Sequence, residues 1–89
     1  MKWPYLEVTF RHGRPLAAYW YVSRSPGDRS CRTSQAGVGM IVDDTEAGKP
    51  IGIEITAPEK VTIAELNGVL ASLNVPTLAA EDIAPLRAA

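Results

Sequence analysis

Four acidic residues occur within GMIVDDTEAGKPIGIEI, the stretch from Gly39 to Ile55, and they are the first side chains to consider for chemistry. Carboxylates can bind Ca²⁺ or Mg²⁺ through their oxygens, or act as general acids and bases. Their spacing lacks the alternating ligand positions of an EF-hand loop. In the simplest interpretation they form a water-facing hairpin edge; the alternatives are a partner contact and a metal or catalytic site. The four are Asp43, Asp44, Glu46 and Glu54.

Asp43 and Glu54 are the two acids expected to act together. Asp43 ends one predicted strand and Glu54 lies inside the next, so we expect the two carboxylates to face each other. Like charges opposed across strands are mildly destabilising unless a cation compensates them. An arginine from the first half of the chain can supply that charge. The resulting candidate binding residues are Asp43, Glu54, Arg24, Arg32 and Tyr19.

The other reactive side chains do not form a catalytic or metal-binding set. His12 is the only histidine and Cys31 the only cysteine, which excludes multi-histidine and Cys/His zinc sites. Both lie in polar segments without an evident orienting partner for nucleophilic catalysis. The fragment 37–39, GVG, lacks the third glycine and the following helix of a dinucleotide-binding loop. We therefore expect no cofactor, no metal and no enzymatic activity.

Charge is divided unevenly along the chain. Residues 1–36 hold six basic and two acidic side chains, whereas residues 37–89 hold three basic and eight acidic ones. Five arginines in the first part are interspersed with Tyr19, Trp20 and Tyr21. Arginines and aromatic residues on an exposed sheet can bind single-stranded nucleic acid. A pI of about 5.7 and the lack of an RNA-recognition signature disfavour nucleic acid as a partner.

Length and composition predict one small domain, residues 1–89. The chain is 46% hydrophobic and 21% charged, as is usual for a globular protein. No apolar run approaches the ~20 residues of a membrane span, and the N-terminus lacks the apolar core of a signal peptide. A single cysteine fits a reducing compartment. We expect a soluble cytoplasmic protein with no membrane partner.

Alternation of apolar and polar residues predicts an antiparallel sheet across residues 3–56. Ile51, Ile53 and Ile55 share one strand face, and burying them sets the register because a one-residue slip would expose all three. Gly48 is expected at positive φ in the preceding hairpin loop. The polar strand at 31–36 is expected at an edge. The predicted strands cover residues 5–10, 17–23, 31–36, 40–43 and 51–56.

The periodicity changes after Pro58. Thr62 and Glu65 form a capping box that begins a helix over 62–73, and its apolar stripe needs the isoleucine face as a partner. The tail, 77–89, is expected to hold a short helix around 78–84 that Pro85 ends, with frayed residues beyond. The predicted fold class is α+β: a twisted antiparallel sheet of four to five strands, arranged as a meander or hairpins, with one C-terminal α-helix packed on one face.

Several segments together carry a resemblance to a known family. They are AAYWYV at 17–22, Thr33, GMIVD at 39–43, Gly48 and IGIEI at 51–55. This pattern resembles the YuzE-like family of small bacterial proteins, whose function is unknown, and the resemblance covers roughly residues 4–56. It implies a small antiparallel sheet with a C-terminal helix, and some family members look like the antitoxin half of toxin–antitoxin pairs. The sequence departs from the family at 25–30 and at 44–45, where an aromatic residue more usually follows the aspartate.

Taken together, these features favour a non-enzymatic protein-binding module, and the resemblance adds an antitoxin-like role. The expected partner is another small, toxin-like protein or a second copy of the chain, joined through Trp3 or Tyr19. One alternative is a small-ligand-binding protein or enzyme that uses Asp43 and Glu54 with an arginine. Another is a weak nucleic-acid binder that uses the arginines and aromatic residues of the sheet.

Overall fold

The computed structural model describes residues 4–22 and 25–87 and shows an α+β fold with a five-stranded antiparallel sheet. The strands are β1 (Tyr5–Arg11), β2 (Arg14–Tyr21), β3 (Arg32–Gly37), β4 (Met40–Asp44) and β5 (Pro50–Ile55). Their order across the sheet is β1-β2-β5-β4-β3. Strand β5 therefore lies at the centre, between its hairpin partner β4 and the sequence-distant strand β2. The expected edge position of the polar strand β3 is confirmed.

The hairpin of β4 and β5 is formed as the sequence predicts. Gly48 has φ of 86°, and the Thr45 amide donates to the Lys49 carbonyl at 2.9 Å to close the loop. The regular alternation is interrupted once, because Asp43 pairs with Gly52 whereas Asp44 pairs with Pro50. This bulge leaves Ile51 as the extra residue on β5. The three isoleucines are all fully buried, but the strict alternation expected for them holds only from Gly52 onward.

Three helical segments follow the sheet. They are η1 (Pro58–Lys60), α1 (Ile63–Ser72) and η2 (Ala80–Arg87), of which η1 and η2 are 3-10 helices. The capping box before α1 is confirmed: the Glu65 amide donates to Thr62 Oγ1 at 3.1 Å, and the Thr62 amide donates to Glu65 Oε1 at 3.0 Å. At the other end, Asn74 has φ of 58° and the Val75 amide donates to the Leu70 carbonyl at 3.2 Å. This pattern ends α1 in a Schellman motif.

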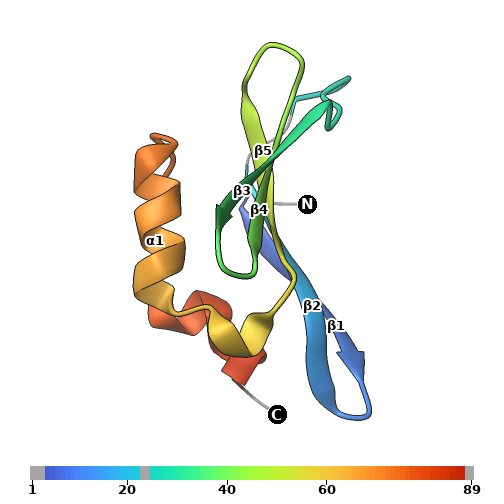
Figure 1. Cartoon of the computed structure of the whole chain (residues 1–89), viewed down its shortest axis with the longest axis vertical. Coiled ribbons are helices and arrows are strands. Elements are labelled where there is room, and N and C mark those ends of the chain that lie inside the picture. The colour runs from blue at the N-terminus through green and yellow to red at the C-terminus, as the bar shows by residue number, and fades with distance from the viewer. Residues whose placement is uncertain (1–3, 23–24, 88–89) are drawn as a thin grey trace.

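Helix α1 covers one face of the sheet (Figure 1). Its Leu66 and Leu70 side chains are fully buried and belong to the same apolar cluster as Trp20, Ile53 and Ile55. Burying a side chain of this size contributes roughly 1.5–3 kcal/mol. The predicted packing of the helix on the isoleucine face is therefore confirmed for Ile53 and Ile55, whereas Ile51 is buried outside this cluster.

The tail differs from its prediction. A short helix around 78–84 was expected to end at Pro85, but the 3-10 segment η2 runs to Arg87 with Pro85 inside it. Leu78, Ile83 and Leu86 are buried in the main core, and this burial holds the segment in place beyond the proline. Helix α1 is thus not the last element of the chain. None of the helices in the described part is both long and apolar enough to span a membrane.

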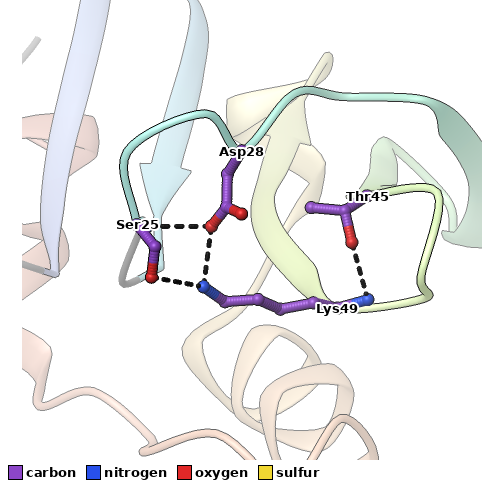
Figure 2. Close-up of polar contacts among 4 residues, drawn as sticks. All are labelled: Ser25, Asp28, Thr45 and Lys49. Atoms are coloured by element: carbon purple, nitrogen blue, oxygen red, sulfur yellow. Dashed lines mark hydrogen bonds and ion pairs between the residues drawn. The ribbon is translucent and has the colours of Figure 1, made fainter.

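Two loops at one end of the sheet are joined by the Lys49 side chain (Figure 2). Lys49 Nζ lies 2.7 Å from Asp28 Oδ2 and donates to Ser25 Oγ at 3.2 Å. The same Asp28 oxygen accepts the Ser25 amide at 2.8 Å. On the other side, the Lys49 amide donates to Thr45 Oγ1 at 3.1 Å. These bonds tie the connection between β2 and β3 to the hairpin loop of β4 and β5.

Candidate functional site

The candidate site lies on the face of the sheet opposite α1, which we call the open face. Helix α1 and both 3-10 segments lie on the other side of the sheet (Figure 1). Successive strand residues point to opposite faces, so the neighbours of the buried Trp20 and Ile53 belong to the open face. Cross-strand pairing arranges them in two rows, Glu7–Tyr19–Glu54 and Tyr5–Tyr21–Gly52–Asp43.

Three tyrosine rings form a continuous aromatic surface on the open face. The Tyr5 and Tyr21 rings are stacked, with centroids 4.4 Å apart and an interplanar angle of 13°. The Tyr19 ring lies 4.4 Å from that of Tyr21 at 48°. The Tyr21 hydroxyl donates to Glu7 Oε1 at 3.2 Å. Burial, followed by the neighbouring Glu7 carboxylate, raises the pKa of Tyr21, so this hydroxyl remains protonated as a hydrogen-bond donor.

Tyr19 reaches across the central strand to Asp43. Its hydroxyl donates to Asp43 Oδ2 at 2.6 Å, from β2 to β4. Strand β5 lies between them, and a Cβ atom placed on Gly52 would collide with the Tyr19 ring. The absence of a side chain at Gly52 therefore creates the space in which the ring lies. This contact joins residues that are 24 positions apart in the sequence.

Asp43 on β4 and Glu54 on β5 are neighbouring acids and form a carboxyl pair. Asp43 is only 5% exposed, and its Oδ1 atom is buried without a hydrogen-bond partner. A proton on Glu54 makes that carboxyl a donor toward Asp43, and this hydrogen bond is the main cause that raises the pKa of Glu54. Desolvation and repulsion between the two charges raise it further. Glu54 therefore keeps its proton to a higher pH than an ordinary glutamate does.

A shallow depression lies beside this pair. It has a volume of about 210 Å³, and Glu7, Thr9, Ala17, Tyr19 and Glu54 are among the residues that line it. Glu7 and Glu54 approach it from β1 and β5, on either side of Tyr19. Because the Tyr19 ring leans over Gly52, and because Ala17 is small, the space between the two carboxylates remains open. The depression thus combines two acids with an aromatic wall.

The water-facing interpretation of the acids is correct for Glu46, which is exposed, but wrong for Asp43. Asp43 lies on an inner strand, and the Tyr19 side chain crosses to it. The expected geometry of the pair is also modified. Asp43 pairs with Gly52, whereas Glu54 pairs with Ile41, so the two acids are diagonal neighbours and are not directly opposed.

The structure brings three of the five predicted site residues together: Asp43, Glu54 and Tyr19. Arg32 is exposed on the edge strand β3, where it pairs in register with Asp44 instead of Asp43. Arg24, as well as Trp3 of the predicted self-association surface, lies outside the described residues. Compensation of the carboxyl pair by an arginine of the chain consequently stays a prediction.

Sequence reasoning did not include Glu7, Tyr5, Tyr21 or Gly52 in the site. Their signals were present as alternation: Tyr5 and Glu7 share one strand face, as do Tyr19 and Tyr21, and Gly52 shares a face with Glu54. Alternation identifies the residues on one face of one strand. It does not say which strands are neighbours, and the strand order is what assembles the site.

A second, larger groove of about 550 Å³ lies between the β1–β2 hairpin and the segment around η1. Arg14, Glu59 and Lys60 contribute to its lining, and all three are exposed. Charges of both signs that remain in water define no particular ligand. The carboxyl pair, with its buried unpartnered oxygen, is the more specific feature.

No group of three or more histidine, cysteine, aspartate or glutamate side chains within residues 4–22 and 25–87 is arranged to hold a metal ion. Comparison with protein-family models, with curated proteins and with solved structures finds no match to this chain.

Proposed function

We propose that this chain is a non-enzymatic protein-binding module that presents the open face of its sheet to a partner protein. One observation carries the proposal. A surface of three adjoining tyrosine rings lies next to a carboxyl pair whose buried member, Asp43, has an oxygen without a donor. Tyrosine is enriched where proteins bind one another, because it offers a large apolar ring together with a polar tip.

The side chains of this face are held before any partner arrives. Tyr19 is fixed by its 2.6 Å hydrogen bond to Asp43 and by its position over Gly52. Tyr21 is stacked on Tyr5 and bonded to Glu7. Side chains that are already ordered lose little conformational entropy on binding, which favours affinity. The underlying sheet is held in turn by the core on its other face.

The alternative of a small-ligand-binding protein or enzyme also has one observation in its favour, the raised pKa of Glu54. A carboxyl whose pKa is raised by its surroundings is a candidate for general acid or base catalysis. The adjoining depression of about 210 Å³ is, however, smaller than the ~300–1,000 Å³ pockets that usually enclose small molecules. Turnover in a substrate screen that Glu54→Gln and Asp43→Asn both abolish without unfolding would support this alternative instead.

Nucleic-acid binding is less favoured on this face. The tyrosine rings share it with the carboxyl groups of Glu7, Asp43 and Glu54. Carboxylates repel phosphate, whereas faces that bind single strands combine stacking rings with positive charge. The aromatic surface consequently matches a basic protein partner better than an RNA or DNA strand.

The resemblance to YuzE-like proteins adds a narrower proposal, an antitoxin-like role with a small toxin-like protein as the partner. Support for it comes from the residues that carry the resemblance, namely 17–22, Thr33, 39–43, Gly48 and 51–55. Co-expression with the product of the adjacent gene tests it, because an antitoxin-like chain would bind that product and relieve its toxicity. The other candidate partner is a second copy of this chain. The crosslinking experiment below distinguishes it by the mass of the conjugate.

Site-specific photo-crosslinking in cells that naturally produce the chain tests the main proposal. A photoreactive residue at Thr9, exposed on the open face, should capture one partner reproducibly. The matched control is the same residue at Ser72, which is exposed on α1. A conjugate of twice the chain's mass would identify self-association. Equal capture of the same partner from both positions, or capture from Ser72 alone, would contradict the use of the open face.

A further inference from the structure

Strand β3 is the less protected of the two edges of the sheet. Edge strands are commonly protected from pairing by charged residues, prolines, bulges or a covering segment. At the other edge, β1 carries Glu7 and Arg11, and η2 packs against it. In β3 the one charge is Arg32 at its start, and the register shift lies at Ala36 near its end. Residues 33–35 between them are uncharged and exposed, so this edge is open to another strand.

The register of the sheet shows which backbone groups of β3 point away from it. The Thr56 amide donates to the Gly39 carbonyl at 2.9 Å. Alternation along an antiparallel pair then directs the odd-numbered residues of β4 to β5 and the even-numbered ones to β3. Ser34 is paired in register with one of these even-numbered residues. The backbone N–H and C=O groups of Thr33 and Gln35 therefore point outward, where no further strand of the described chain lies.

We infer that β3 pairs with β3 of a second copy of this chain, antiparallel and about a two-fold axis at Ser34. An outward row of backbone donors and acceptors is matched by another extended strand. The strand that lies against residues 33–35 needs small or uncharged side chains, and β3 itself meets this description. In this register Thr33 of each copy faces Gln35 of the other, so the outward backbone groups of both residues are hydrogen-bonded in both copies.

Charge and regularity select this register. An axis at Arg32 would place two guanidinium groups opposite each other, which is unfavourable. An axis at Gln35 would set Thr33 against Gly37, across the register shift at the end of β3, and an axis at Thr33 would require a residue that precedes the strand. About Ser34, the two arginines are more than about 13 Å apart, because four residues at ~3.3 Å each separate them along the strands.

One strand pair is a small interface. It buries less than the ~1,200 Å² that stable complexes usually need, so we expect a reversible dimer with a Kd between about 10 µM and 1 mM. The contact lies at the far edge of the sheet from β1 and β2, which carry the tyrosines. It is therefore separate from the binding of a partner to the open face, and it places two open faces in one particle.

Sedimentation equilibrium of the full chain tests the association. As the concentration rises from about 10 µM to 1 mM, the average mass should increase from 9.6 kDa towards twice this value. Ser34→Glu opposes two like charges at the axis and should weaken the dimer by at least about tenfold. Mixing Ser34→Glu with Ser34→Lys should restore association as a heterodimer. Ala64→Glu, at an exposed position of α1, is the matched control and should leave the Kd within about twofold.

Disulfide trapping locates the axis. The variants are made in a Cys31→Ser background, which removes the exposed thiol of the chain. Ser34→Cys should form a disulfide-linked dimer in oxidised glutathione, because Cα atoms opposed in this way are ~4.5 Å apart, within the range that a disulfide spans. Thr33→Cys on the same strand places its two Cα atoms beyond ~7 Å and should crosslink at least about tenfold more slowly. Amide spectra of the reduced variants confirm that each is folded.

Three results would overturn this inference: a chain that stays monomeric to about 1 mM, a dimer that Ser34→Glu and Ala64→Glu weaken equally, or equal trapping at Ser34 and Thr33. A photoreactive residue at Gln35 that captures only a different protein would show that a strand of that protein occupies the edge instead. The test is independent of the proposed function. A dimer through β3 together with failed capture from Thr9 would contradict the use of the open face alone.

Discussion

The Tyr19 hydroxyl and the Asp43 carboxylate are joined by a 2.6 Å hydrogen bond that spans the central strand of the sheet. The two residues belong to β2 and β4, which do not pair with each other. The bond forms because the strand between them presents Gly52 at the crossing point. One backbone position without a side chain therefore holds together the aromatic and the acidic halves of the open face.

Replacing Gly52 with alanine should destabilise the protein by about 2–4 kcal/mol. The new Cβ would collide with the Tyr19 ring, which adds an overpacking penalty, and displacing the ring would remove the hydrogen bond to Asp43. Thermal or urea unfolding measures the change. Gly68→Ala is the matched control, because nothing lies near its Cβ position in α1; it should stabilise by about 0.5–1 kcal/mol. Equal small effects at both glycines would contradict the crossing geometry.

Tyr19→Phe should destabilise by about 1–3 kcal/mol, because the buried Asp43 carboxylate would lose its hydroxyl donor while its other oxygen already lacks one. Tyr21→Phe removes an exposed 3.2 Å bond to Glu7 and should change stability by no more than about 0.5 kcal/mol. Urea unfolding of both variants at pH 7 provides the comparison. A larger loss for Tyr21→Phe than for Tyr19→Phe would be inconsistent with the burial of Asp43.

Glu54 should contribute to the free energy of unfolding in a pH-dependent way. The sign of this contribution is opposite to that of a carboxylate whose pKa is lowered on folding. Its pKa in the folded protein is raised above its ordinary value of 4.5, so the folded state binds this proton more tightly than the unfolded state does. The resulting stabilisation is fully present below about pH 4.5 and is lost as pH rises through the folded-state pKa. Glu54→Gln should abolish this component.

The measurement is the difference in unfolding free energy between the native sequence and Glu54→Gln across pH 4–8. The difference should shift in favour of the glutamine variant as pH rises, since glutamine does not ionise beside Asp43. Glu46→Gln, at an exposed loop position, serves as the control and should show no such trend. A difference for Glu54→Gln that stays constant with pH would contradict the raised pKa of Glu54.

The contacts of the Lys49 side chain, which join the two loops, should matter more for local order than for global stability. Its side chain is 41% exposed, and ion pairs accessible to water usually contribute only ~0–1 kcal/mol. Lys49→Met should therefore lower the unfolding free energy by less than about 1 kcal/mol while speeding hydrogen exchange at the Asp28 amide. Lys60→Met provides an exposed control. If the protection of the Asp28 amide against hydrogen exchange is unchanged in Lys49→Met, the Lys49 contacts do not order this loop.

The sequence by itself determined the local structure of this protein. The capping box of Thr62 and Glu65, the positive φ at Gly48 and the burial of Ile53 and Ile55 all follow from patterns within a few residues. Capping, turn conformation and alternation depend on neighbours in the chain, so a single sequence carries them. The same patterns placed Asp43 and Glu54 on adjoining arms of one hairpin.

Only the tertiary structure decided that β2 lies beside β5. The pairing of β2 with β5 brings Tyr19 over Gly52 to Asp43. Asp43 is therefore buried, although the hairpin pattern alone predicts that it faces water. Strand order depends on which distant segments bury the most apolar surface together, a property of the whole core that no local pattern encodes. The continuation of η2 through Pro85 has the same origin, because the burial of Ile83 and Leu86 outweighs the local signal for a break.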